Sequence, residues 1–172
     1  MSWFDEAEEL LEKMKRSQEA NDRYWSKFTP RAHQVLSFAN KEARETKASC
    51  IGVEHLLVGL LGAGGGLRVL RDHGLTPEVV RAEILKLYGG AADIENAPHY
   101  LHTTPRLNSV LKAAEGEAIA LSHTYVGTYH LLLALLAQPE GVAHRIFKAA
   151  NIDPAEIRNE ILREIDAGGN LT

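Results

Sequence analysis

Hydrophobic residues recur along most of the chain with the spacing of an α-helix. Two segments, after Pro30 and after Pro105, carry apolar residues three and four positions apart, which places them on one helix face. Their apolar positions are Ala32, Val35, Leu36, Ala39 and Ala43, and then Leu107, Val110, Leu111, Ala114, Ala118 and Leu121. No segment alternates apolar and polar residues over a useful strand length. The pattern therefore predicts an all-α fold.

Short polar residues followed by proline indicate where four helices begin. The side-chain oxygen of Thr or Asp can accept a free backbone N–H at a helix N-terminus, and proline has no N–H that needs a partner there. The four pairs are Thr29-Pro30, Thr76-Pro77, Thr104-Pro105 and Asp153-Pro154. Each pair thus predicts a helix N-terminus.

The chain contains an internal repeat. Residues 28–61 align without gaps with residues 103–136, and 14 of the 34 positions are identical. The identities include Thr-Pro-Arg at the start of the long helix and Gly-x-x-His-Leu-Leu at the start of a leucine-rich one. A unit of about 60 residues makes a small core when it stands alone. We therefore predict two tandem four-helix units, packed together as a pseudo-two-fold pair.

This repeat divides the chain into five parts. Residues 1–27 form a charged N-terminal helix or extension, and residues 28–90 form the first repeat. Residues 91–103 are a linker, residues 104–167 form the second repeat, and residues 168–172 are a tail. The N-terminal helix has only a narrow apolar stripe, formed by Phe4, Ala7, Leu11 and Met14. It either docks on its own chain or extends from it, or it binds a partner or a second copy.

Composition and charge narrow the class of protein. The 172 residues include 23 acidic and 19 basic side chains, so the formal net charge of -4 argues against binding to nucleic acid or to an anionic membrane. The single cysteine, Cys50, cannot form an intramolecular disulfide. No window is long and apolar enough to cross a membrane, and the acidic N-terminus does not resemble a signal peptide. We therefore expect a soluble, cytoplasmic protein.

The repeated motifs resemble a known family. Phe-Thr-Pro-Arg-Ala at 28–32, and Gly52 and His55 before Leu56-Leu57, recur in the second half as Thr-Thr-Pro-Arg-Leu, Gly127 and His130. This pattern is similar to the double Clp repeat, the N-terminal domain of Clp-type AAA+ unfoldases, in particular of the ClpC type. The resemblance covers about residues 28–166. The phosphate-binding loop GxxxxGK[ST] is absent from the sequence, so no ATPase module is expected here.

The resemblance implies a phosphoarginine pocket in each repeat. In ClpC-like domains a Thr at a helix N-terminus suits the phosphoryl group, and the carboxylate of a Gly-Thr-Glu-His motif suits the guanidinium. The first repeat reads Gly-Val-Glu-His at 52–55, so its expected pocket contains Thr29, Glu54 and Arg31. The second repeat reads Gly-Thr-Tyr-His at 127–130, and its pocket is degenerate. That second set is Thr104, Tyr129 and Arg106.

Structural roles compete with these assignments. Thr29 and Thr104 can act as helix N-caps alone, and Glu54 can be a first-turn acid that the helix dipole favours. The two arginines can simply be solvated or ion-paired. A Cys50–His55 nucleophile and base would make an enzyme, but residue 125, which corresponds to Cys50, is tyrosine, and no orienting Asp or Asn is evident. We expect buried structural histidines at His55 and His130, and no metal ion or cofactor.

The leading functional hypothesis is a non-enzymatic protein-binding module of the Clp unfoldase and protease system. By resemblance, it would capture protein substrates or adaptors, including phosphoarginine-marked ones, for Clp ATPase and protease components. The alternative is a stand-alone regulatory or assembly subunit that docks on a Clp protease or unfoldase ring. The charged segment 1–27 favours this alternative, because it differs from the usual short start of the N-domain.

Overall fold

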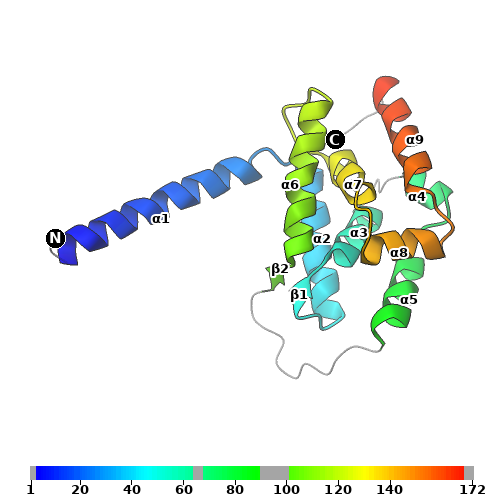
Figure 1. The fold of residues 1–172 in the computed structure, drawn as a ribbon, viewed down its shortest axis with the longest axis horizontal. Helices are drawn as coiled ribbons and strands as arrows, with labels where there is room; N and C mark the ends of the chain where they lie inside the picture. The colour runs from blue at the N-terminus through cyan, green and yellow to red at the C-terminus, as the bar shows by residue number, and fades with distance from the viewer. Residues whose placement is uncertain (1–2, 64–67, 90–100, 169–172) are drawn as a thin grey trace.

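The structure is a computed structural model that describes residues 3–63, 68–89 and 101–168. Within these residues the chain forms nine helices and two very short strands (Figure 1). In chain order they are α1 (Trp3–Trp25), α2 (Pro30–Glu45), β1 (Cys50–Ile51), α3 (Val53–Gly62), α4 (Arg68–Asp72), α5 (Pro77–Tyr88), β2 (His102–Thr103), α6 (Pro105–Ala120), α7 (Thr128–Leu136), α8 (Val142–Ala149) and α9 (Pro154–Asp166). The all-α prediction and the two sets of four helices, α2–α5 and α6–α9, are confirmed. Most of the expected linker and tail lies outside the described residues.

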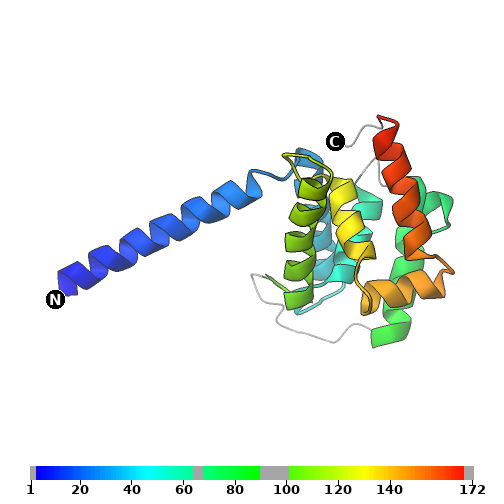
Figure 2. The same ribbon diagram turned by 45° about the horizontal axis from the view of Figure 1, so that its top comes forward.

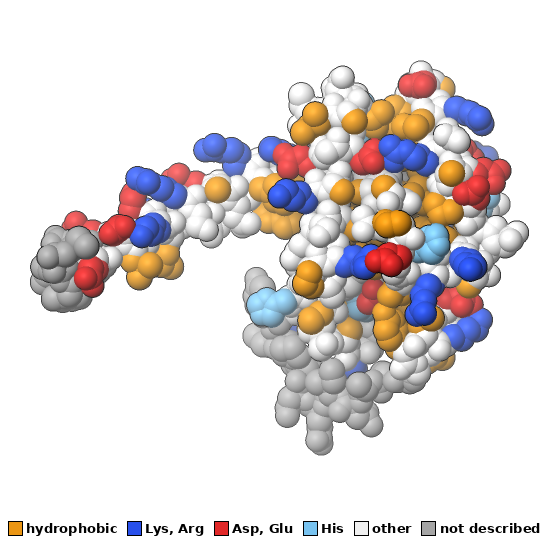
Figure 3. All heavy atoms as spheres, in the orientation of Figure 1, with side chains coloured by type: hydrophobic (Ala, Val, Ile, Leu, Met, Phe, Trp, Pro, Cys, Tyr) orange, Lys and Arg blue, Asp and Glu red, His pale blue; other side chains and the backbone are white. Residues whose placement is uncertain are grey.

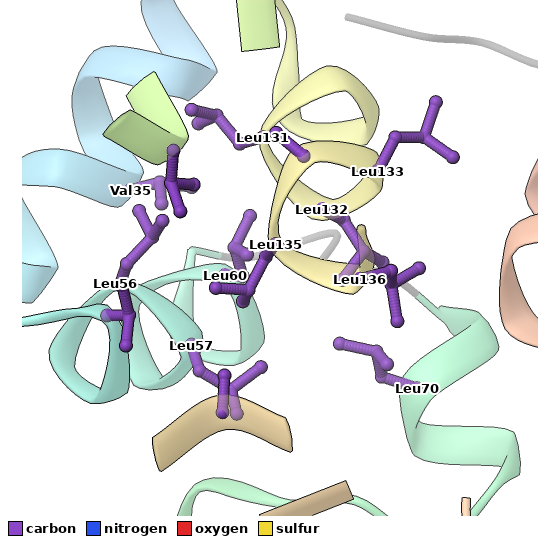
Figure 4. Close-up of a cluster of buried hydrophobic side chains, with 14 of the residues drawn as sticks. Val35, Leu56, Leu57, Leu60, Leu70, Leu131, Leu132, Leu133, Leu135 and Leu136 are labelled. Carbon is purple, nitrogen blue, oxygen red and sulfur yellow. The ribbon is translucent and has the colours of Figure 1, made fainter. Parts of the chain in front are cut away.

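Both repeats contribute to one hydrophobic core. The leucine-rich helices α3 and α7 lie in the middle of the body, and the other helices of the two repeats cover them (Figures 1 and 2). Figure 4 shows their side chains facing one another across the boundary between the repeats. The labelled residues are Val35, Leu56, Leu57, Leu60, Leu70, Leu131, Leu132, Leu133, Leu135 and Leu136. Because α3 and α7 are buried on nearly all sides, each repeat completes the core of the other.

The predicted helix N-termini are confirmed at all four Thr/Asp-Pro pairs. The Oγ1 atom of Thr29 accepts a hydrogen bond from the backbone N–H of Ala32 at 3.2 Å. Thr104 accepts from Leu107 N–H at 3.1 Å in the corresponding position of the second repeat. Thr76 and Asp153 cap α5 and α9 in the same way. These caps are local, which is why the sequence alone predicts them.

Short backbone pairings join the beginning of helices in one repeat to the beginning of helices in the other. β1 pairs in parallel with β2, so that Cys50 lies beside His102 and Ile51 beside Thr103. A second parallel bridge joins Phe28 to Val126. These strands are too short to produce an alternating pattern, which is why sequence analysis did not predict them. The pairings fix which helix ends of the two repeats meet.

Helix α1 projects away from this body (Figures 1 and 2). Its C-terminal end is anchored through Tyr24 and Trp25, whose rings lie 5.3 and 5.0 Å from the ring of buried Phe28. Lys27 forms an ion pair with Glu115 of α6 just after the helix. The rest of α1 extends from this anchor without packing on α2–α9, as the figures show.

Gly59 allows α2 and α3 to approach closely. A Cβ atom at this position would lie inside van der Waals distance of the Val35 carbonyl oxygen and 3.2 Å from the Ala39 nitrogen. Both neighbours are backbone atoms of α2, which cannot rotate away as a flexible side chain could. The corresponding residue of the second repeat is the buried Ala134, so α6 and α7 have room for a methyl group there.

Replacing Gly59 with alanine is therefore expected to lower the free energy of unfolding by about 1–3 kcal/mol, because α2 and α3 must separate. Urea denaturation measures the change. Gly116 is the matched control, since it lies in helix α6 and a Cβ atom added to it would have no neighbour within 4 Å. Gly116→Ala should raise stability by about 0.5–1 kcal/mol because alanine has the higher helix propensity. Equal stabilisation by both substitutions would contradict the close approach.

Candidate functional site

A pocket of about 510 Å³ opens where the first repeat meets the start of α6. Its wall includes the acid Glu54 from the first turn of α3 and Thr104 from the N-terminus of α6. The residues lining it are Thr46, Lys47, Ala48, Ser49, Cys50, Glu54, His55, Arg81, Ile84, Leu85, Tyr88, Gly89 and Thr104. The pocket thus combines a carboxylate, a helix N-terminus and an apolar side.

The structure regroups the residues of the two expected pockets. The sequence hypothesis joins Thr29 to Glu54 within the first repeat, but the threonine that lines the Glu54 pocket is Thr104. Its backbone N–H donates to the Ile51 carbonyl oxygen at 2.9 Å, which continues the β1–β2 pairing. Thr29 instead donates its N–H to the carbonyl oxygen of Val126, at the start of α7. The grouping by repeat is therefore corrected: each threonine lies at the α3 or α7 start of the other repeat.

The carboxylate of Glu54 is held over the N-terminus of its own helix. Its side chain is 15% exposed, and one of its oxygens lies 3.5 Å from Nδ1 of His55. The carboxyl group occupies the space beside Gly52 where any other residue would place its Cβ atom. A negative charge is stabilised at this end of a helix. Glycine at position 52 thus gives the carboxylate its place at the edge of the pocket.

The C-terminal part of α5 forms the apolar side of the pocket. Ile84, Leu85 and Tyr88 line it, and the last two are well exposed to solvent. Burial and the negative charge of Glu54 raise the pKa of the Tyr88 phenol. Tyr88 and Glu54 both line the pocket. The sequence analysis did not identify this wall, because its residues resemble the apolar face of any amphipathic helix.

The corresponding junction of the second repeat, where the start of α7 meets the start of α2, has different chemistry. Tyr129 occupies the position of Glu54, and its hydroxyl donates a hydrogen bond to Oε2 of Glu164 in α9 at 2.8 Å. Burial and this carboxylate raise the pKa of Tyr129 to about 12. The phenol is therefore neutral and already has an acceptor. As the sequence predicts, residue 129 offers no carboxylate to a guanidinium at this junction. The Glu164 carboxylate already accepts a hydrogen bond from the Tyr129 hydroxyl.

The two arginines of the hypothesis lie on the surface. Arg31 is exposed on α2, next to the cap residue Thr29. Arg106 of α6 donates from Nη1 to the carbonyl oxygen of Glu140 at 2.8 Å, and its other Nη lies 3.8 Å from the Glu140 carboxylate. Arg106 therefore secures the loop before α8, and neither arginine is among the residues that line the Glu54 pocket.

Buried histidines complete the N-terminal turns of α3 and α7. Nδ1 of His55 accepts a hydrogen bond from the Gly52 N–H at 2.9 Å, and Nδ1 of His130 accepts from Gly127 N–H at 2.8 Å. Each ring therefore carries its proton on Nε2 when neutral. Nε2 of His55 lies 3.4 Å from the Thr46 hydroxyl. Both nitrogens of His55 are thus engaged, so the ring is not arranged as a base for Cys50, which lines the pocket half-buried.

Equivalent Arg–Glu pairs brace the first and last helices of both repeats. Arg81 of α5 donates two hydrogen bonds of 2.7 Å to the Glu42 carboxylate of α2. Arg158 of α9 donates two of 2.9 Å to Glu117 of α6. The alignment of residues 28–61 with 103–136 pairs Glu42 with Glu117, but sequence analysis did not identify the arginines. Arg81 and Arg158 lie beyond the aligned ranges and are 77 residues apart instead of 75, so an alignment extended with a two-residue shift would have paired them.

Two further observations concern metal-binding groups and membrane-spanning helices in the described part of the chain. Among residues 3–63, 68–89 and 101–168, no three His, Cys, Asp or Glu side chains are grouped as a metal site would require. No helix within the same ranges combines the length and the apolar character needed to span a bilayer.

Fold and junctions together define a two-repeat helical domain in which each repeat completes the other. The family model for the Clp repeat (R) N-terminal domain matches this chain at residues 4–73, 27–121 and 102–170. Together these matches span nearly the whole sequence. The chain belongs to the Clp repeat N-terminal domain family.

Curated relatives show the same affiliation. The chain is 40% identical over 146 residues to a probable ATP-dependent Clp protease ATP-binding subunit of Chlamydia pneumoniae, a match that covers 83% of this chain and 17% of the relative. It is 34% identical over 150 residues to the chloroplastic chaperone protein ClpC1 of Arabidopsis thaliana, covering 86% of this chain and 16% of that protein. The chain therefore spans about one sixth of the length of these relatives.

Solved structures share the fold. The N-terminal domain of the caseinolytic protease associated chaperone ClpD from Arabidopsis thaliana superposes with a TM-score of 0.70 at 20% identity, covering 83% of this chain and 96% of that one. The Hsp104 N-terminal domain from Candida albicans gives a TM-score of 0.67 at 19% identity, covering 78% and 89% of the two chains. At these identities the likeness concerns the fold alone.

Proposed function

We propose that this chain is a non-enzymatic recognition domain of a Clp-type unfoldase and protease system in the cytoplasm. It would bind protein substrates or adaptors through the Glu54 pocket and present them to Clp ATPase and protease components. Membership of the Clp repeat family supports this role. The single observation that carries the proposal is that Glu54 and Thr104, from different repeats, line one pocket.

The ligand that suits this pocket best is a phosphoarginine side chain. Its guanidinium would lie against the Glu54 carboxylate, which can accept two parallel hydrogen bonds. Its phosphoryl group would lie at the N-terminus of α6, where backbone N–H groups and the helix dipole favour an anion. The Thr104 oxygen accepts the capping hydrogen bond, so its O–H can still donate to the phosphoryl oxygen. Ile84, Leu85 and Tyr88 would contact the apolar part of the ligand.

Glu54→Gln is expected to weaken binding of free phosphoarginine by about 10- to 100-fold, because hydrogen bonds to a charged acceptor lose their ionic component. Isothermal titration calorimetry gives the affinity, and titration with free arginine shows how much the phosphoryl group contributes. Glu156→Gln is the matched control, since Glu156 is also a first-turn acid but lies on α9, which contributes no residue to the lining of the pocket. Unchanged affinity of Glu54→Gln would exclude this role for the carboxylate.

A second candidate function is a regulatory or assembly subunit that docks on a Clp ring. One observation favours it: α1 extends away from the body and leaves most of its surface available for another protein (Figure 1). Under this alternative, capture of Clp ring components would require α1 and would survive Glu54→Gln. Under the leading proposal, capture of the substrate would require Glu54.

A further inference from the structure

Gly52 stands where the chain leaves the short strand β1 and enters helix α3, and its backbone is held on both sides. Its N–H donates to Nδ1 of His55 at 2.9 Å, and its carbonyl oxygen accepts from the Leu56 N–H at 3.2 Å. The carbonyl oxygen of the preceding residue, Ile51, accepts from the Thr104 N–H at 2.9 Å. A shift of the backbone here would therefore disturb the contacts that join the start of α3 to the N-terminus of α6.

The carboxyl group of Glu54 lies over this glycine. A Cβ atom at residue 52 would lie 2.6 Å from Cδ of Glu54, and its three nearest neighbours would all be atoms of this carboxyl group. Carbon atoms that are not bonded to each other pack at about 3.5–4.0 Å. The carboxyl group and a Cβ atom therefore cannot occupy these positions together.

This conflict falls on a side chain, whereas the conflict at Gly59 falls on backbone atoms. The atoms of Glu54 near residue 52 form the end of a flexible side chain, which can rotate away. The φ and ψ angles of Gly52 are -105° and 179°, an extended conformation that alanine also adopts. Alanine at residue 52 is therefore expected to keep the backbone in place and to displace the carboxylate.

The place of this carboxylate matters because the pocket offers its two polar groups at a set separation. Gly52 lies two residues before Glu54, and Ile51 is bonded to Thr104, so a short stretch of backbone connects the carboxylate to the N-terminus of α6. Groups held in position before binding lose less conformational entropy when a ligand arrives. Displacing the carboxylate would remove this advantage while both groups remain in the molecule.

The charge pattern of the surface gives further weight to individual contacts. Acidic and basic side chains are interspersed over the face of the body that Figure 3 draws. Where opposite charges alternate in this way, their fields largely cancel at a distance. A charged ligand is then held by the particular groups it contacts, so the position of one carboxylate has a direct effect on affinity.

We propose that Gly52 is a positioning residue of the Glu54 pocket: the missing side chain at residue 52 keeps the Glu54 carboxylate at a fixed place relative to the N-terminus of α6. Gly52 is thus a determinant of affinity, although it is not among the residues that line the pocket. Its effect on binding rests on the proposed function, whereas its effect on the position of the Glu54 side chain does not.

The first test is a double-mutant cycle of Gly52→Ala and Glu54→Ala, in which isothermal titration calorimetry measures the affinity for free phosphoarginine. Gly52→Ala alone should weaken binding about tenfold, because the carboxylate leaves its place. In the Glu54→Ala background the same substitution should change the affinity by less than about twofold, since no carboxylate remains to be displaced. Thermal unfolding verifies that each variant is folded.

Gly62→Ala is the matched control for this cycle. Gly62 lies in the same helix but does not line the pocket, and its added Cβ atom would have one neighbour, a ring carbon of Phe38 at 3.9 Å. It should leave the affinity unchanged. Equal losses from Gly52→Ala in both backgrounds would assign the effect to a general distortion of α3 and overturn the proposal. A loss in Glu54→Ala without one in Gly52→Ala would also overturn it, and would leave the proposed function intact.

The second test needs no ligand. Crystal structures of the wild type and of Gly52→Ala should show the Glu54 carboxyl group rotated away from residue 52 in the variant. The residue 52 N–H should still donate to His55, and the Thr104 N–H to the Ile51 oxygen. A carboxyl group in its original place, accommodated by a shift of the backbone, would overturn the proposal. This comparison decides the proposal even where the wild type does not bind phosphoarginine, an outcome that would refute the proposed ligand alone.

Discussion

Replacing Arg81 with alanine is expected to lower the free energy of unfolding by about 3–5 kcal/mol at neutral pH. The Glu42 side chain is only 5% exposed, and Arg81 supplies the two hydrogen bonds that compensate its charge. Without the guanidinium, a buried carboxylate must stay charged without a partner or take up a proton. Helix propensity opposes this loss only weakly, because alanine is only a slightly stronger helix former than arginine. Urea denaturation measures the loss.

The second repeat supplies the comparison. Arg158→Ala removes the equivalent pair, but Glu117 is 16% exposed and can recover more hydration, so the loss should be smaller, about 2 kcal/mol. The double variant Glu42→Leu/Arg81→Leu should recover much of the stability lost in Arg81→Ala, because it removes both charges from the buried site. A loss below about 1 kcal/mol for Arg81→Ala would mean that the Glu42 pair does not brace the fold.

Acidification from pH 6.5 to pH 4 is expected to destabilise the protein by up to about 3 kcal/mol through His130 alone. The ring is 1% exposed. Burial and neighbouring His123 lower the pKa of His130 to about 4, although Glu117 acts in the opposite direction. The unfolded chain takes up this proton near pH 6.5, whereas the folded chain resists it down to about pH 4. Between these values the unfolded state binds more protons, so lowering the pH favours unfolding.

The structure gives the reason for this resistance. Nδ1 of His130 accepts the Gly127 N–H, so a proton added there would face a donor. Nε2 already donates its own proton to Nδ1 of His123 at 2.8 Å. The N–H that protonation would create at Nδ1 would therefore have no neighbouring acceptor. His55 of the first repeat has its pKa lowered mainly by burial, and it adds to the same trend.

His130→Gln isolates the effect of one ring. Glutamine at this helix position can still accept the N-cap N–H, as in a capping box, but does not titrate. Chemical denaturation at several pH values should show a shallower decline for the variant than for the wild type. His102→Gln, at an exposed histidine, should leave the decline unchanged. Parallel declines for His130→Gln and wild type would assign the acid sensitivity to other groups.

Much of the fold could be predicted from the sequence because its signals are local. Helix α2, for example, is encoded by the cap at Thr29 and by apolar residues spaced for one face. The repeat extends this information, since one set of motifs read twice indicates two equivalent units. Gly59 marks a limit: the sequence shows a glycine where the second repeat has Ala134, but not that the α2 backbone lies against it.

The candidate site was only partly predictable. Glu54 was identified through the resemblance to ClpC-like domains, because it stands where their Gly-Thr-Glu-His motif has its carboxylate. Its grouping with Thr29 followed the order of the chain, whereas the structure places Thr104 at the pocket. The Glu42–Arg81 pair was missed because its members are 39 residues apart and neither position is unusual by itself.

The sequence by itself determined the helices, their capped N-termini and the division into two related units, because these depend on spacing and on hydrogen bonds between near neighbours. Tertiary structure alone decided which helix ends meet. The pairing of residues 50–51 with 102–103, and of Phe28 with Val126, brings the N-terminus of α6 to the acid of α3. That choice depends on how two buried faces pack against each other, and a repeated sequence is compatible with pairing inside a unit as well as across units.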